Sequence, residues 1–161
     1  MMLSRLAKLF INECDKHLMR LNHAAAKMVL FMPLNVDRYL ALSEDEIEHL
    51  DQFLFRFAKL KDTIGEKLLI SILEYLQEEN PKFKPFIDIL NRLEQLESLE
   101  EKNNWLELRK IRNNISHQYE DEPKQASEAL NEIYNAKPML ETIYLSLKRR
   151  YTFKLRLYRS L

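Results

Sequence analysis

The chain has a single glycine, Gly65, and only five prolines among its 161 residues. Tight turns between strands depend on these residues, because glycine adopts positive backbone angles without strain and proline presets the φ angle of turn positions. A protein built from short strands needs such a turn roughly every 8 to 12 residues. The scarcity of turn residues therefore predicts an all-α protein, an antiparallel bundle of four to five helices.

Apolar residues spaced three or four apart mark the helices. The expected ranges are 3–32, ended by Pro33; 43–80, one long helix or two collinear ones, opened by a Ser43/Glu46 capping box; 86–96; 103–120; and 124–158, with a kink or break at Pro138. Gly65 falls inside the second range, where we expect it to allow another helix to approach closely. In the fourth range the inward-facing residues are predicted to be Trp105, Leu108, Ile111 and Ile115.

The length suits one domain spanning residues 1–161. Cys14 is the only cysteine, so no intramolecular disulfide can form, which fits a reducing compartment. The first residues carry interspersed charges and lack the apolar run of a signal peptide or a membrane span. We therefore expect a cytoplasmic protein that does not contact a membrane.

The net charge is zero, with 25 basic and 25 acidic residues, but the C-terminal end, residues 148–161, has basic residues and no acidic ones. Six basic residues follow the last carboxylate, Glu141: Lys148, Arg149, Arg150, Lys154, Arg156 and Arg159. This end could contact a polyanion such as RNA, with Lys148, Arg149 and Arg150 as the candidate residues. It could equally be a solvated helix end whose cations complement the helix dipole.

A polar cluster, "RNNISHQY", stands near the end of the fourth predicted helix. With about 100° of rotation per residue, Arg112, Ser116 and Tyr119 share one stripe of that helix, while Asn113 and His117 share the next. Arg112 and His117 therefore do not meet automatically within one helix. A frayed last turn, or a second copy of the helix packed across a two-fold axis, would bring them together.

These side chains suit phosphodiester chemistry. The planar guanidinium of Arg112 matches phosphate oxygens, and His117 can exchange a proton near neutral pH. In RNA cleavage the ribose 2′-OH attacks the adjacent phosphate, which requires a base, an acid and a cation but no metal ion. The alternative is structural, because an arginine and a histidine at a helix end often cap carbonyls or pair with carboxylates such as Glu120 and Asp121.

The pattern Arg112-x4-His117-x-Tyr119, with Asn113 directly after the arginine, resembles the motif of the HEPN superfamily. The version with tyrosine is similar to the HEPN toxin that is encoded beside a minimal nucleotidyltransferase antitoxin. The resemblance covers roughly residues 42–147, and it also includes "DQFLFRFAKLKDTIGEKL", which looks like the long second helix of such proteins. It implies a HEPN-like helical bundle.

Carried over to this chain, the resemblance implies a metal-independent endoribonuclease that works as a homodimer with its motifs facing a shared cleft. Arg112 would bind the scissile phosphate, His117 would act as general base or acid, and Asn113 would organise the site. Tyr119 would be the tyrosine that the antitoxin modifies with AMP, which would block RNA binding. Ser116 is a further candidate RNA contact. The implied partners are RNA and a nucleotidyltransferase antitoxin, with no cofactor.

Two alternatives remain open. The same cluster could hold a nucleotide or a nucleotidyltransferase partner in a non-catalytic HEPN module, or the chain could be a purely structural bundle that dimerises through the fourth helix. Metal sites are not expected. Glu46 and His49 form one E-x-x-H pair where di-iron bundles need two, and Cys14 and His17 lack a second pair of ligands. We instead expect Cys14 to be buried, His17 to be partly exposed and His23 to be structural.

Overall fold

The computed structural model describes residues 2–75, 85–95, 102–115 and 122–159, and every regular element in these ranges is helical. The elements are α1 (Met2–Met28), α2 (Val36–Leu40), α3 (Glu44–Thr63), the π-helix η1 (Ile64–Leu68), α4 (Leu69–Tyr75), α5 (Phe86–Gln95), α6 (Lys102–Ile115) and α7 (Pro123–Arg159). The prediction of an all-α fold is therefore confirmed.

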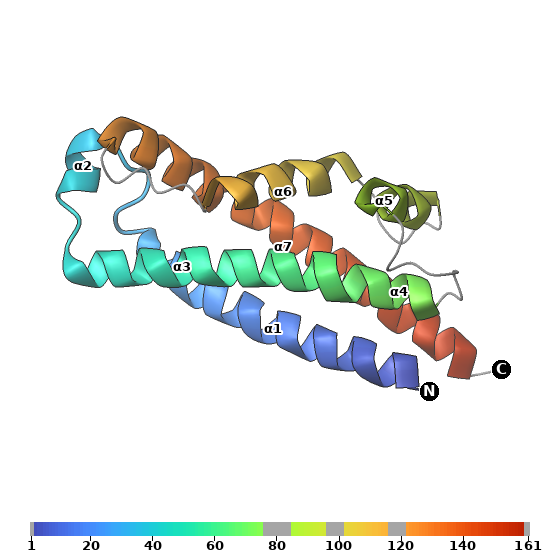
Figure 1. The fold of residues 1–161 in the computed structure, drawn as a ribbon. Coiled ribbons are helices and arrows are strands. Elements are labelled where there is room, and N and C mark those ends of the chain that lie inside the picture. The colour runs from blue at the N-terminus through green and yellow to red at the C-terminus, as the bar shows by residue number, and fades with distance from the viewer. Residues whose placement is uncertain (1, 76–84, 96–101, 116–121, 160–161) are drawn as a thin grey trace.

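The long helices lie side by side along one axis and alternate in direction (Figure 1). α1 and the continuous rod of α3, η1 and α4 run antiparallel, and α6 and α7 form a second antiparallel pair. α2 lies at one end of the bundle against α7, while α5 lies at the other end, near both chain termini. None of the described helices combines the length and the apolar character that crossing a membrane requires.

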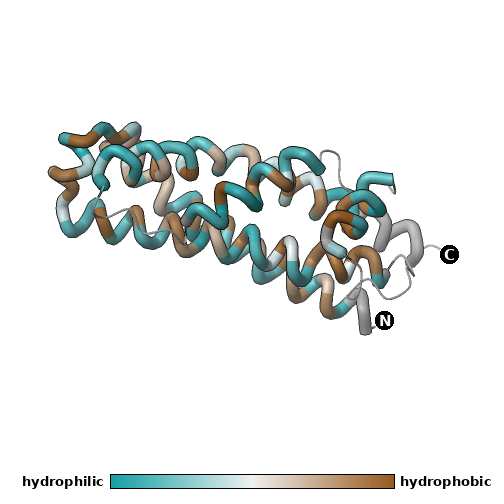
Figure 2. The backbone as a smooth tube through the Cα atoms, turned by 45° about the horizontal axis from the view of Figure 1, so that its top comes forward, coloured by the Kyte–Doolittle hydropathy of each residue, from teal (hydrophilic) through white to brown (hydrophobic). Residues whose placement is uncertain are grey.

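One apolar face of each long helix builds a continuous core, and Figure 2 shows hydrophobic and hydrophilic residues alternating along the tube as this requires. The largest side chains that are fully buried include Trp105, Tyr144, Tyr151, Phe53 and Phe57. Trp105, Leu108 and Ile111 are all at most 4% exposed, as their spacing predicted, whereas the side chain of Ile115 lies outside the described residues.

Helix boundaries follow local chemistry. The Ser43/Glu46 capping box is present in both directions, because the Ser43 hydroxyl accepts from the Glu46 amide and the Glu46 carboxylate accepts from the Ser43 amide. Glu46 also pairs with Arg38 of α2. The short helix α2, capped by the Asn35 side chain, lies where only a loop was expected.

Two expected boundaries were wrong. α1 ends at Met28 instead of Met32, because the chain already turns there, with the Phe31 amide donating to the Met28 carbonyl. Pro138 does not break α7, which is one helix from Pro123 to Arg159. Packing of the apolar face of α7 on the core compensates for the hydrogen bond that a proline cannot donate.

Gly65 lies within η1, where α6 crosses the α3–α4 rod. A Cβ atom built on Gly65 would come within 3.1 Å of Cζ2 of Trp105, closer than normal van der Waals contact. The expectation that this glycine admits another helix is therefore confirmed. η1 continues the rod with a local i→i+5 hydrogen bond from the Leu69 amide to the Ile64 carbonyl.

We predict that Gly65→Ala lowers the free energy of unfolding by about 1 kcal/mol, because overpacking against the fully buried Trp105 outweighs the better helix propensity of alanine. Urea denaturation of the two proteins measures the difference. In a Trp105→Phe background, which removes the contacting Cζ2, the same substitution should be neutral or stabilising. A destabilisation of equal size in both backgrounds would contradict the steric explanation.

Candidate functional site

The described residues contain only part of the predicted site. Ser116, His117 and Tyr119 lie in 116–121, outside the described residues, so their placement stays a prediction. Arg112 and Asn113 lie in the last turn of the described part of α6. Asn113 is exposed, whereas Arg112 is half-buried at the junction of α6 with α3.

Arg112 is held by a carboxylate of α3. Its Nε donates to Oδ1 of Asp62 at 3.0 Å, and its Nη2 donates to Oδ2 at 2.9 Å. Side chains of both residues are about a quarter to a third exposed, at 26% and 30%. This side-on fork raises the pKa of Arg112, since the hydrogen bonds and charge of Asp62 favour the charged guanidinium. The pair therefore fixes the plane of the guanidinium.

The fork leaves part of the guanidinium directed away from Asp62. An arginine has five N–H donors, and the Asp62 carboxylate engages Nε and one N–H of Nη2. Nη1 makes no hydrogen bond to a described residue. A phosphate oxygen could therefore approach the Nη1 edge while Asp62 keeps the other edge in place.

A second cation, Lys61, lies close enough to Asp62 and Arg112 to interact with their charges. Its side chain is buried, and its Nζ lies 5.1 Å from the centroid of the Trp105 ring. Burial is the main cause that lowers the pKa of Lys61; the nearby charges of Arg109 and Arg112 act in the same direction, while Asp62 opposes them. A cation–π contact stabilises a buried ammonium in place of water.

The Lys61 and Trp105 pair also carries hydrogen-bond donors that lack acceptors. Nε1 of Trp105 is buried and has no hydrogen-bond partner among the described residues. Nζ of Lys61 likewise makes no hydrogen bond within the described part of the chain. The junction of α3, η1 and α6 is therefore rich in donors and positive charge, with Asp62 and Glu66 as the acidic residues that affect it.

Sequence reasoning did not identify Asp62 or Lys61. Each lies about fifty positions from Arg112, and a helical wheel relates only residues of one helix. The available signal was Gly65, which indicated that another helix crosses the rod a few residues further on.

Of the candidate RNA contacts on α7, Lys148 is half-exposed and forms an ion pair with Asp15 of α1, at 3.0 Å to each carboxylate oxygen. Asp15 also accepts a hydrogen bond from the buried Tyr144 hydroxyl at 2.5 Å. Burial and the Asp15 carboxylate raise the pKa of Tyr144 far above its ordinary value. Arg149 is exposed, and Arg150 is half-buried.

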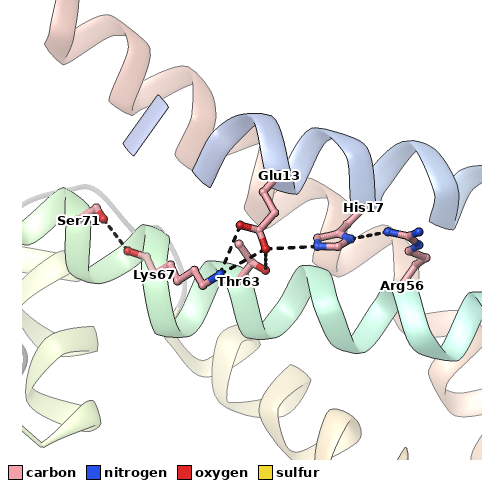
Figure 3. Close-up of polar contacts among 6 residues, drawn as sticks. All are labelled: Glu13, His17, Arg56, Thr63, Lys67 and Ser71. Carbon is pink, nitrogen blue, oxygen red and sulfur yellow. Dashed lines mark hydrogen bonds and ion pairs between the residues drawn. The ribbon is translucent and has the colours of Figure 1, made fainter. Parts of the chain in front are cut away.

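A chain of polar contacts joins α1 to the α3–η1–α4 rod (Figure 3). Glu13 accepts from the Thr63 hydroxyl and from Nζ of Lys67, each at 3.4 Å. His17 lies between Glu13 and Arg56, with its Nδ1 2.9 Å from Nη1 of Arg56. Because arginine has no acceptor, Nδ1 must be the acceptor and the ring is neutral, with its proton on Nε2.

His17 is buried, although its spacing suggested a partly exposed side chain, and His23 is exposed although its position suggested a structural one. Cys14 is fully buried, and burial raises the pKa of its thiol to about 12. Within the described residues no three His, Cys, Asp or Glu side chains are grouped as metal ligands.

We predict that His17 makes the fold sensitive to acid. Burial, followed by the charge of Arg56, lowers the pKa of His17 from 6.5, and the opposing effect of Glu13 is smaller. The unfolded chain therefore binds a proton at a higher pH than the folded chain does. Stability from neutral His17 is complete above about pH 6.5 and is lost as the pH falls through the lowered pKa of the folded state.

Urea denaturation at about pH 7.5 and about pH 5.5 tests this. His17→Gln keeps an acceptor for Arg56 but cannot be protonated, so it should lose less stability than the wild type over this interval. The control is His23→Gln, at an exposed histidine of the same helix. If His17→Gln and His23→Gln lose equal stability, the prediction is wrong.

Comparison of the chain with protein-family models, with curated proteins and with solved structures found no match.

Proposed function

We propose that this protein is a metal-independent endoribonuclease of the HEPN type, the toxin of a toxin–antitoxin module, which acts as a homodimer. The observation that carries the proposal is the sequence pattern Arg112-x4-His117-x-Tyr119 with Asn113. Its first two residues, Arg112 and Asn113, lie in α6. An all-helical fold is compatible with it. The position of Arg112 is also compatible with the proposal, because Asp62 holds one edge of its guanidinium.

In the proposed reaction Arg112 binds a non-bridging oxygen of the scissile phosphate through its Nη1 edge. A base removes the proton of the ribose 2′-OH, the oxygen attacks the phosphorus, and the 5′-oxygen leaves with a proton from an acid. His117 supplies one of these two roles, and His117 of a second protomer would supply the other. Lys61 adds positive charge behind Arg112, and Asn113 orients the site.

A second candidate function is a non-catalytic HEPN module that binds a nucleotide or a nucleotidyltransferase partner. The observation that favours it is the Arg112–Asp62 fork. A guanidinium already paired with a carboxylate has less charge to offer the developing charge of a transition state, but it can still orient a bound phosphate.

We expect the purified protein to cleave single-stranded RNA in the presence of EDTA. Arg112→Ala and His117→Ala should each reduce the rate by about 100-fold or more, since each removes a group that acts in the transition state. Asp62→Asn should reduce it by about tenfold, because Arg112 loses its charged anchor. Lys110→Ala, at an exposed cation of the same helix, is the control and should retain wild-type activity.

Equal cleavage by all variants, or no cleavage by any, would exclude the nuclease. ATP or RNA binding without turnover, lost in Arg112→Ala, would instead support the non-catalytic module.

We also expect AMP on Tyr119 when the protein is co-produced with its cognate nucleotidyltransferase. Intact mass spectrometry should show an increment of one or more AMP groups, and peptide mapping should place the first on Tyr119. Phosphate and adenine on Tyr119 would add negative charge and bulk to the proposed site and suppress cleavage. Tyr119→Phe is the control, and an unchanged AMP increment in this variant would place the modification elsewhere.

A further inference from the structure

The outer face of α1 carries positive charge and no carboxylate. Five cations between positions 5 and 27 are exposed: Arg5, Lys8, Lys16, Arg20 and Lys27. On an ideal helix they lie within an arc of about 120°, opposite the stripe that faces the core. Because the whole chain has equal numbers of basic and acidic residues, a surface helix would ordinarily show both signs.

The described part of α1 does contain two carboxylates, but both flank the core-facing stripe and are engaged by neighbouring helices. Glu13 faces the α3–α4 rod, where it contacts Thr63 and Lys67. Asp15 faces α7, where it pairs with Lys148 and accepts from the Tyr144 hydroxyl. Both carboxylates of α1 therefore pair with residues of other helices, and only positive charge is left on the outer face.

Cations on the neighbouring helices extend this face. On the α3 side, Arg56 contacts His17, and Lys59 is close enough to lower the pKa of the same histidine. On the α7 side, Lys148 forms its ion pair with Asp15 at the border of the face. The described length of α1, 27 residues, corresponds to about 40 Å of helix.

We propose that the outer face of α1 is a binding surface for the phosphate backbone of RNA. A linear array of lysine and arginine along a rigid helix matches a linear polyanion, and such contacts require no base-specific groups. The surface lies apart from the Arg112 junction, which α6 forms with the other side of the bundle. The choice of RNA as the polyanion rests on the proposed function, whereas the binding measurement itself is independent of RNA cleavage.

An anionic membrane is a less suitable occupant. A helix that lies in a membrane interface inserts a continuous apolar face, whereas the apolar stripe of α1 is buried in the core. The exposed apolar residues on the outer face include Leu9 and Met19, which are separated by about 15 Å of helix.

Fluorescence anisotropy with a labelled 2′-O-methyl oligonucleotide of single-stranded RNA tests the proposal. This probe cannot be cleaved through its 2′-OH, so nuclease activity does not affect the measurement. Lys16→Glu/Arg20→Glu should weaken binding at least about tenfold and make the salt dependence shallower, because two phosphate contacts are lost. Lys8→Glu/Lys27→Glu, on the same face, should act in the same way.

The matched control is Lys110→Glu/Lys124→Glu, which changes the net charge equally at exposed residues of α6 and α7. This control should bind RNA within about twofold of the wild type. Circular dichroism melts confirm that each variant is folded. Both double substitutions on α1 must weaken RNA binding for the proposal to hold. Equal weakening by the control would show an effect of net charge and overturn the proposal.

Two competitors test the class of ligand. Vesicles of phosphatidylserine and phosphatidylcholine, or poly-glutamate, at the same charge concentration as the RNA should displace the probe weakly. If either one displaces the probe as well as unlabelled RNA does, the surface is not an RNA site and the proposal fails.

Discussion

The close packing of Trp105 on Gly65 determines how the two halves of the bundle meet. Trp105 is the largest fully buried side chain, and it reaches the backbone of η1 because residue 65 has no side chain. The same ring stacks against the Lys61 ammonium, so a buried cation is stabilised where α6 crosses the rod. Seven residues further along α6, two turns later on the same face, Arg112 meets Asp62. The proposed phosphate-binding arginine therefore depends on a steric contact made elsewhere in the junction.

Charge is distributed in the bundle according to what each helix must contact. The carboxylates that face neighbouring helices, Glu13, Asp15 and Asp62, each pair with a cation from another helix. Pairs of this kind at partly exposed positions contribute little stability individually. Their larger effect is on the register between the paired helices and on the surface potential. Glu13 and Asp15 of α1 point toward neighbouring helices, so the exposed outer face of α1 carries only positive charge. A chain with no net charge can thus present a strongly basic helix.

The burial of His17 and His23 could not be predicted from their spacing in the sequence. His17 and His23 lie on the same helix, six residues apart, and their local sequences suggested a partly exposed and a structural residue. The structure places His17 in a buried contact with Arg56 and leaves His23 exposed. Spacing identifies a face of a helix, but which face meets a partner depends on where that partner packs. The lowered pKa of His17 follows from its burial and then from the charge of Arg56, thirty-nine positions away, and no local pattern contains that information.

The sequence by itself determined the class of fold and most of the helices. One glycine and few prolines exclude a protein of many turns, the apolar spacing gave the inward faces of α6, and the Ser43/Glu46 box fixed the start of α3, because all of these are local properties of the chain. It also supplied the motif on which the proposed nuclease rests. Only the tertiary structure revealed Asp62 and Lys61 beside Arg112, the neutral His17 and the basic face of α1. Each of these depends on contacts between helices that are distant in sequence, and such contacts are set by the packing of the whole bundle.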